Sequence, residues 1–177
     1  NQMPEVRKEL ESAEQHLDDM QEAITAFLTG SMRETVSDDQ ARSIQSIQRI
    51  AHELESISDS CFSIGMLMER LQRKGWKLHE DADDELYTYT AQVLRFLDYN
   101  GDLLQGKDGQ VDLDHAFELE KKIDKVRNKL KKRSRRVIER DEHPDVKGEL
   151  AFIDIVRHLE HIGDYSLNVS EAVAELS

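Results

Sequence analysis

The sequence is poor in the residues on which several fold classes depend. Only two prolines and eight glycines occur among 177 residues, which leaves little of the turn chemistry that a β-sheet needs. The single cysteine, Cys61, excludes an internal disulfide and any zinc site built from cysteines, and it favours a reducing compartment. No apolar run approaches the roughly 20 residues that span a bilayer, and no signal-peptide pattern opens the chain. Because the chain begins at Asn1 rather than at methionine, we expect it to be a piece of a longer protein.

Charge is what the sequence has in abundance. Charged residues make up 34% of the chain, and the formal net charge is −13. This balance argues against a general nucleic-acid binder, because neutralising phosphates requires a positive surface. Metal ions or a cationic partner suit this acidic chain better. The abundance of Leu, Glu, Lys and Arg favours long helices, so we predict an all-α protein.

Apolar residues recur at alternating spacings of three and four, which is the pattern of amphipathic helices. We expect the apolar stripes to face a core; they include Met20 and Phe27 in the first helix and Ile47 and Met68 in the second. Loop signals between the stretches predict an antiparallel bundle of five long helices. The expected helices cover residues 5–30, 37–75, 81–104, 112–142 and 146–176.

Two motifs occur twice, in the same order. The phrase "LExIxD" at Leu54 recurs at Leu159, and the motif "ExxLD" at Glu14 recurs as "ExxID" at Glu120. Because both offsets are close to 105 residues, we predict an internal duplication with units at 1–78 and 79–177. The helix at 81–104 has no counterpart in the first unit, which therefore lacks its first helix. The carboxylates repeated in this way are Glu14, Asp18, Glu55 and Asp59 in the first unit, and Glu120, Asp124, Glu160 and Asp164 in the second.

Each repeated pair consists of a Glu and an Asp four residues apart. At about 100° per residue the two side chains lie on one side of their helix, near the margin of its apolar face. Carboxylates that converge at a partly buried seam repel one another unless a cation or a proton is shared. Such sites suit hard ions such as Mg²⁺, Ca²⁺, Mn²⁺ or iron. The alternative is that the pairs are ordinary solvated surface residues copied by the duplication.

At these motifs the chain resembles a known family. The stretch "LEHIGDYSLNVSE" at 159–171 is similar to the "LERIGDxxxNIxE" signature of the PhoU family of phosphate-uptake regulators, and "ELEKKIDKVRNKL" at 118–130 is similar too. The stretches "LDDMQEAITAFLTG" and "SDDQARSIQSIQRIAHELESISD" in the first half more specifically resemble the PhoU-like domain at the cytoplasmic C-terminus of bacterial sodium/phosphate cotransporter-like proteins. The chain departs from the pattern at Ser58, which replaces the glycine found at Gly163.

The resemblance implies tandem three-helix repeats, with the first helix of repeat one absent, and a regulatory rather than enzymatic role in phosphate uptake. It implies a cytoplasmic domain associated with the inner membrane, with a transporter membrane domain or another transport-system protein as its partner. It also implies that the repeated carboxylates hold iron or another hard metal, such as Mn, Mg or Ca. The implied ligands are Glu160, Asp164, Glu120, Asp124, Glu55, Asp59, Glu14 and Asp18.

A basic block interrupts the acidic chain. Eleven of the 24 Lys and Arg residues lie between Lys121 and Arg140. This block either contacts anionic lipid head groups or an acidic partner, or is a solvated helix that pairs with acidic neighbours. Self-association into a homo-oligomer also stays open.

Two other functions stay open beside phosphate regulation. A carboxylate-bridged metal enzyme would require open coordination positions and a substrate cavity, and the lack of any Glu-x-x-His motif weakens it. A purely structural oligomerisation bundle would be unharmed by neutralising Glu160 and Asp164, because only repulsion would be lost.

Overall fold

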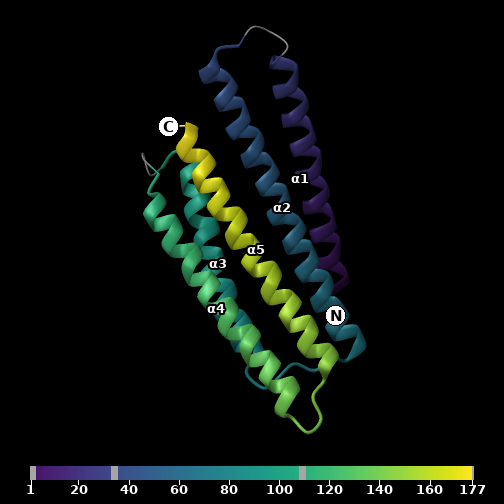
Figure 1. Ribbon diagram of the computed structural model, residues 1–177. Helices are drawn as coiled ribbons and strands as arrows, with labels where there is room; N and C mark the ends of the chain where they lie inside the picture. Colours follow the sequence, from purple (N-terminus) through teal and green to yellow (C-terminus); the bar gives the residue numbers. More distant parts are fainter. Residues whose placement is uncertain (1–2, 33–35, 108–110, 177) are drawn as a thin grey trace.

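The computed structural model describes residues 3–32, 36–107 and 111–176, and within them every regular element is a helix. The expected all-α bundle is confirmed, and each predicted helix boundary lies within two residues of the observed one. Consecutive helices run up and down the long axis of the molecule, so sequence neighbours are antiparallel (Figure 1). The elements are α1 (Met3–Ser31), α2 (Asp38–Lys74), α3 (Ala82–Leu104), α4 (Leu113–Arg140) and α5 (Val146–Leu176).

Side chains that satisfy backbone groups define the ends of α2 and the start of α4. The Ser37 hydroxyl accepts a hydrogen bond from the Gln40 backbone N–H, and the Gln40 side chain accepts one from the Ser37 N–H. This reciprocal arrangement is a capping box. At the other end Gly75 adopts φ 64°, a left-handed conformation that costs glycine little. Asp112 caps α4 by accepting from the His115 N–H.

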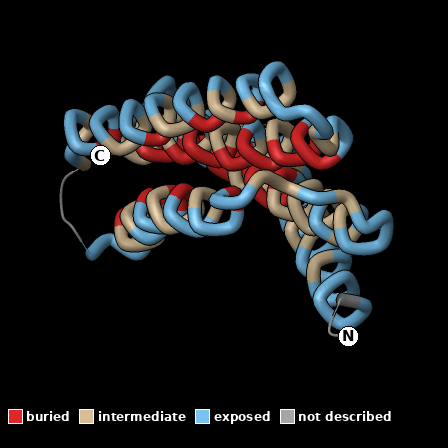
Figure 2. The backbone as a smooth tube through the Cα atoms, turned by 90° about the horizontal axis from the view of Figure 1, so that it is seen from below, coloured by how far each residue is buried: buried red, intermediate tan, exposed pale blue. Residues whose placement is uncertain are grey.

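Helix α5 is the centre of the bundle. It packs against α2, α3 and α4, whereas α1 packs only against α2. The buried residues follow the lines along which the helices face one another, and the outward surfaces are exposed (Figure 2). The largest fully buried side chains include Tyr89 and Phe96 of α3 and Phe152 and Ile162 of α5. The second half of the chain therefore supplies most of the core.

The expectation that all apolar stripes face a core is wrong at four positions. Phe27 is 74% exposed, and Met20, Ile47 and Met68 are exposed as well. For Met20 and Phe27 the reason is that α1 has a single helical neighbour, so one flank of its apolar stripe has no second helix to pack against. Among the described residues, no helix is both long and apolar enough to cross a membrane.

Helices α4 and α5 approach each other closely at Gly163. A Cβ atom added there would lie 3.0 Å from Ile123 Cγ2, tighter than an ordinary contact. Glycine at this mid-helix position, which costs about 1 kcal/mol in helix propensity, therefore allows the two helices to come together. That approach brings the carboxylates of α4 next to those of α5.

Candidate functional site

The structure gathers the eight repeated carboxylates into two clusters, one in each half of the chain. Contacts between neighbouring helices create both clusters, because each helix contributes one Glu and one Asp. The α1–α2 cluster consists of Glu14, Asp18, Glu55 and Asp59, and the α4–α5 cluster consists of Glu120, Asp124, Glu160 and Asp164.

In the α1–α2 cluster three carboxylates converge closely. Glu14, Asp18 and Asp59 each offer an oxygen, and these oxygens lie within 4.8 Å of one another. Burial raises the pKa of Glu55, and the charges of Asp59 and Asp18 raise it further. In the described part of the chain no Lys or Arg pairs with these four residues; the exposed His52 lies beside them, with its Nδ1 3.8 Å from Glu55. The cluster is thus an uncompensated concentration of negative charge.

The α4–α5 cluster contains its own cation. Arg127 of α4 donates to Asp124 at 2.7 Å and to Glu160 of α5 at 3.0 Å. Burial raises the pKa of Glu120, with the charges of Asp124 and Asp164 adding to it, and burial followed by the charge of Glu160 raises the pKa of Asp164. One guanidinium therefore neutralises part of this cluster and leaves repulsion among the rest.

Tyr89 of α3 adds a polar group beside the α4–α5 cluster. Its side chain is fully buried, and among the described residues its hydroxyl has no hydrogen-bond partner. Burial raises the pKa of this hydroxyl, and the charge of Glu160 raises it further, so the phenol stays neutral. The α1–α2 cluster has a third-helix tyrosine as well, Tyr165 of α5, which is only partly buried. Burial raises the pKa of its hydroxyl, and the charges of Glu53, Asp164, Asp59 and Glu55 raise it further.

The spacing of oxygens in the α1–α2 cluster fits a hard metal ion. Hard cations bind carboxylate oxygens at about 2.0–2.6 Å, so oxygens on opposite sides of one ion lie roughly 4–5 Å apart. The three converging oxygens meet that limit. In the α4–α5 cluster the space between Asp124 and Glu160 is already bridged by Arg127, and a metal there would compete with the guanidinium.

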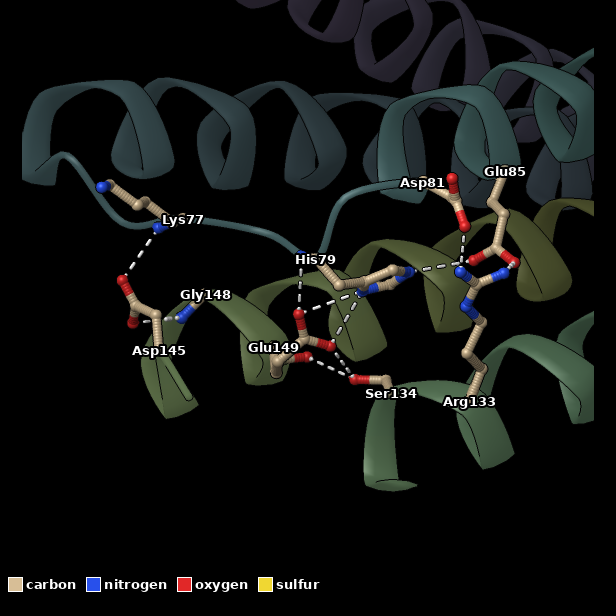
Figure 3. A network of polar contacts seen from close by, with 9 residues as sticks. All are labelled: Lys77, His79, Asp81, Glu85, Arg133, Ser134, Asp145, Gly148 and Glu149. Atoms are coloured by element: carbon tan, nitrogen blue, oxygen red, sulfur yellow. Dashed lines mark hydrogen bonds and ion pairs between the residues drawn. The ribbon is translucent and has the colours of Figure 1, made fainter. Parts of the chain in front are cut away.

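A buried polar network near the α2–α3 connection was not expected from the sequence (Figure 3). His79 lies between two carboxylates, with Nδ1 3.0 Å from Glu149 and Nε2 3.0 Å from Glu85. Glu149 is 1% exposed and also accepts from the His79 backbone N–H at 2.9 Å and the Ser134 hydroxyl at 2.6 Å.

Further contacts extend this network across the lower end of the bundle in Figure 1. Arg133 of α4 bridges Glu85 at 2.8 Å and Asp81. Asp145, just before α5, accepts from the backbone N–H groups of Lys77 and Gly148. The connection between α2 and α3 is thereby attached to α4 and α5. These contacts connect the two halves at one end of the bundle. We therefore interpret the network as structural rather than reactive.

One signal in the sequence points to this network. Glu149 lies three residues before Phe152 and seven before Val156, so a carboxylate occupies a position on the apolar stripe of α5. A charge at a core position is almost always paired. The periodicity identifies the carboxylate but not its partner, because His79 comes from a loop.

Comparison with known proteins yields one match. The PhoU domain matches residues 80–173, which include α3, α4, nearly all of α5 and the α4–α5 cluster. No curated protein and no solved structure gives a match. The match covers more than half of the chain, and it includes the stretches at 118–130 and 159–171 whose motifs resemble that family. The chain therefore belongs to the PhoU family, whose members act in the regulation of phosphate homeostasis.

Proposed function

We propose that this chain is a cytoplasmic regulatory domain of phosphate uptake, which is part of a sodium/phosphate cotransporter or binds to one. The observation that carries the proposal is the PhoU-domain match at 80–173. The motifs of the first half, which resemble the cytoplasmic domain of cotransporter-like proteins, supply the narrower context. A helical bundle suits a domain that acts through contacts with a partner.

The test is phosphate uptake in the native host. Deleting the coding sequence for 80–173 is expected to change how uptake depends on external phosphate, and a wild-type copy should restore the original dependence. Replacing sodium with potassium in the medium identifies the transporter, because the difference should disappear when a sodium-coupled route is silent. An identical uptake curve with and without the domain would refute the regulatory role, and a difference independent of sodium would refute the cotransporter context.

We further propose that the α1–α2 cluster binds a hard metal ion, such as iron, manganese, magnesium or calcium. Glu14, Asp18 and Asp59 would supply the ligand oxygens, with Glu55 beside them. The support is electrostatic: these carboxylates converge without a basic partner among the described residues, so a bound cation would remove repulsion that the fold otherwise bears. The metal would supply positive charge and link α1 to α2.

Metal content of the untagged protein, purified without chelator, tests this proposal. The internal repeat offers a matched pair of variants, since Asp18 and Asp59 correspond to Asp124 and Asp164. The Asp18→Asn, Asp59→Asn variant is expected to lose the metal, whereas Asp124→Asn, Asp164→Asn should keep it. Metal lost only from the second variant would move the site to the α4–α5 cluster. No metal in the wild type, even after supplementation, would refute the proposal while leaving the uptake experiment unaffected.

A further inference from the structure

The outward face of α4 is strongly basic between residues 121 and 136. Between 121 and 136 every exposed residue is Lys or Arg except Asn128. At about 1.5 Å per residue this stretch is roughly 22 Å long. We call it the basic face, and it consists of Lys121, Lys122, Lys125, Lys129, Lys132, Arg135 and Arg136.

Acidic neighbours do not neutralise this surface. Of the 11 cationic side chains between Lys121 and Arg140, only Lys122, Arg127 and Arg133 form ion pairs within the described residues, which leaves eight without an acidic partner. The Lys122 pair is with the exposed Glu118 at 3.8 Å and is therefore weak. Within the described residues the basic face is therefore exposed and mostly unpaired.

Part of the basic face surrounds an open hollow of about 490 Å³. Its lining includes Lys131, Lys132, Arg135 and Arg136, together with the amide of Asn128 and the carboxylate of Glu139 at one end. Four cations and an amide converging on one space provide hydrogen-bond donors for a phosphate group. The hollow lies on the solvent side of α4, away from the α4–α5 cluster, whose members on α4 face α5.

The composition of the face indicates what kind of partner it fits. Protein interfaces are centred on apolar and aromatic side chains and are depleted in lysine. Among the described residues, no large apolar side chain is exposed between Phe117 and Val146, and five of the seven side chains of the basic face are lysines. Clusters of four to eight Lys and Arg along a helix are instead typical of surfaces that bind anionic lipids.

We propose that the basic face of α4 docks onto the phosphate head groups of an anionic phospholipid membrane. The helix would lie along the bilayer surface, with a head-group phosphate in the hollow lined by Arg135 and Arg136. The acidic remainder of the chain does not prevent this, because at physiological salt charges more than about 8 Å from the surface are largely screened. The proposal does not depend on the role in phosphate uptake or on metal binding.

Co-sedimentation of the purified chain with lipid vesicles tests the proposal. The wild type is expected to bind vesicles of phosphatidylcholine with about 30% phosphatidylglycerol, and not vesicles of phosphatidylcholine alone. The binding should be lost near 1 M salt, where the Debye length falls to about 3 Å. Neutralising four members of the basic face is expected to weaken binding at least about tenfold; the substitutions are Lys125→Gln, Lys129→Gln, Lys132→Gln and Arg136→Gln.

A matched control removes the same charge elsewhere. Lys8, Lys74, Arg95 and Lys147 are exposed and form no ion pair within the described residues, and the four Gln variants combined should weaken binding less than about threefold. Circular dichroism melting of both variants confirms that they fold, which is expected because all eight positions are exposed. Equal binding of the basic-face variant and the wild type, or an equal loss in the control, would overturn the proposal.

Two further readouts exclude other occupants of the face. Inorganic phosphate should release no more protein from the vesicles than sodium chloride of the same ionic strength, and specific release would assign the hollow to a free ion and overturn membrane docking. Sedimentation velocity without vesicles should give the same species for wild type and basic-face variant. A wild-type dimer that the variant loses, without vesicle binding, would assign the face to an acidic surface of a second copy and also overturn the proposal.

Discussion

Each carboxylate cluster contains two Glu and two Asp on equivalent helices. Among the described residues, only the α4–α5 cluster includes a basic side chain, that of Arg127. Arg127 pairs with Asp124 and Glu160 in the second half of the chain. At the offset of 106 residues that relates α4 to α1, the corresponding position in the first half is Gln21. One residue thus separates a cluster that is partly neutralised from within from a cluster that needs a proton or an external cation. Duplicated ligands can therefore differ in function when a single neighbouring residue differs.

The halves differ again in their cores. Leu28 and Ile44 are buried in the first half, and the positions that correspond to them in the second half carry Ser134 and Glu149. An apolar contact layer in one half is replaced by a hydrogen-bonded network in the other, and His79 from the α2–α3 connection completes it. The network of the second half therefore holds the α2–α3 connection in place. An apolar layer would hold it with less directional specificity.

Removing the histidine of this network should have the largest effect on stability. His79→Ala is expected to lower the free energy of unfolding by about 3 kcal/mol, because it leaves the buried Glu149 carboxylate without the imidazole that contacts it. Urea denaturation followed by circular dichroism measures the change. The exposed His16 serves as control, and His16→Ala should stay within about 0.5 kcal/mol of the wild type. Equal effects of the two substitutions would show that the network does not stabilise the fold.

Exchanging the residues that distinguish the clusters should exchange their properties. Arg127→Gln is expected to cost about 1–2 kcal/mol of stability in metal-free buffer, since Asp124 and the largely buried Glu160 lose their cation. Added Mn²⁺ should recover part of that loss by binding the opened cluster. The reciprocal Gln21→Arg substitution should weaken metal binding at the α1–α2 cluster. Thermal melts with and without Mn²⁺ report both effects.

This exchange has a clear contrary result. If Gln21→Arg leaves the metal-induced rise in melting temperature unchanged, a guanidinium beside these carboxylates does not compete with the metal. If Arg127→Gln is as stable as the wild type without metal, the α4–α5 cluster does not depend on its internal cation. Either outcome would remove the functional distinction between the clusters.

The smallest expected effect concerns pH. Burial and neighbouring charges raise the pKa of Glu120, so its contribution to stability is complete below its unfolded pKa of about 4.3 and is lost as pH rises through the folded pKa. Glu120→Gln should therefore raise stability at neutral pH by less than about 1 kcal/mol, because solvent screens the partly exposed group. The difference should vanish below about pH 4.

Asp145, which also lies in the second half, should give the opposite pH dependence of stability. Hydrogen bonds from the Lys77 and Gly148 backbone N–H groups lower its pKa, so its contribution is present above the unfolded pKa and is lost as pH falls through the folded pKa. Asp145→Asn should reduce stability at neutral pH, and the gap should close in acid. Urea denaturation across the pH range compares the two variants, and curves of the same sign would contradict the assigned environments.

Patterns along the chain were sufficient for the helices and for the carboxylates. Spacings of three and four, together with the loop signals between the stretches, located all five helices. A Glu and an Asp four residues apart lie on one side of any helix, so the repeat alone identified groups that the structure brings together. The assignment of metal to these groups stays a proposal, and so does the division of the chain at residue 78.

Contacts between helices could not be read in the same way. Arg127 is one of 11 cations in its helix segment, and no local pattern says that it pairs with α5 while Lys125 and Lys129 face solvent. The exposure of Phe27 and the partners of Glu149 were missed for the same reason. Helical periodicity depends on interactions within one turn, whereas pairing across helices depends on how the whole core sets their rotation and separation. The chain alone thus specifies which groups share a side of a helix, and packing selects which of them meet.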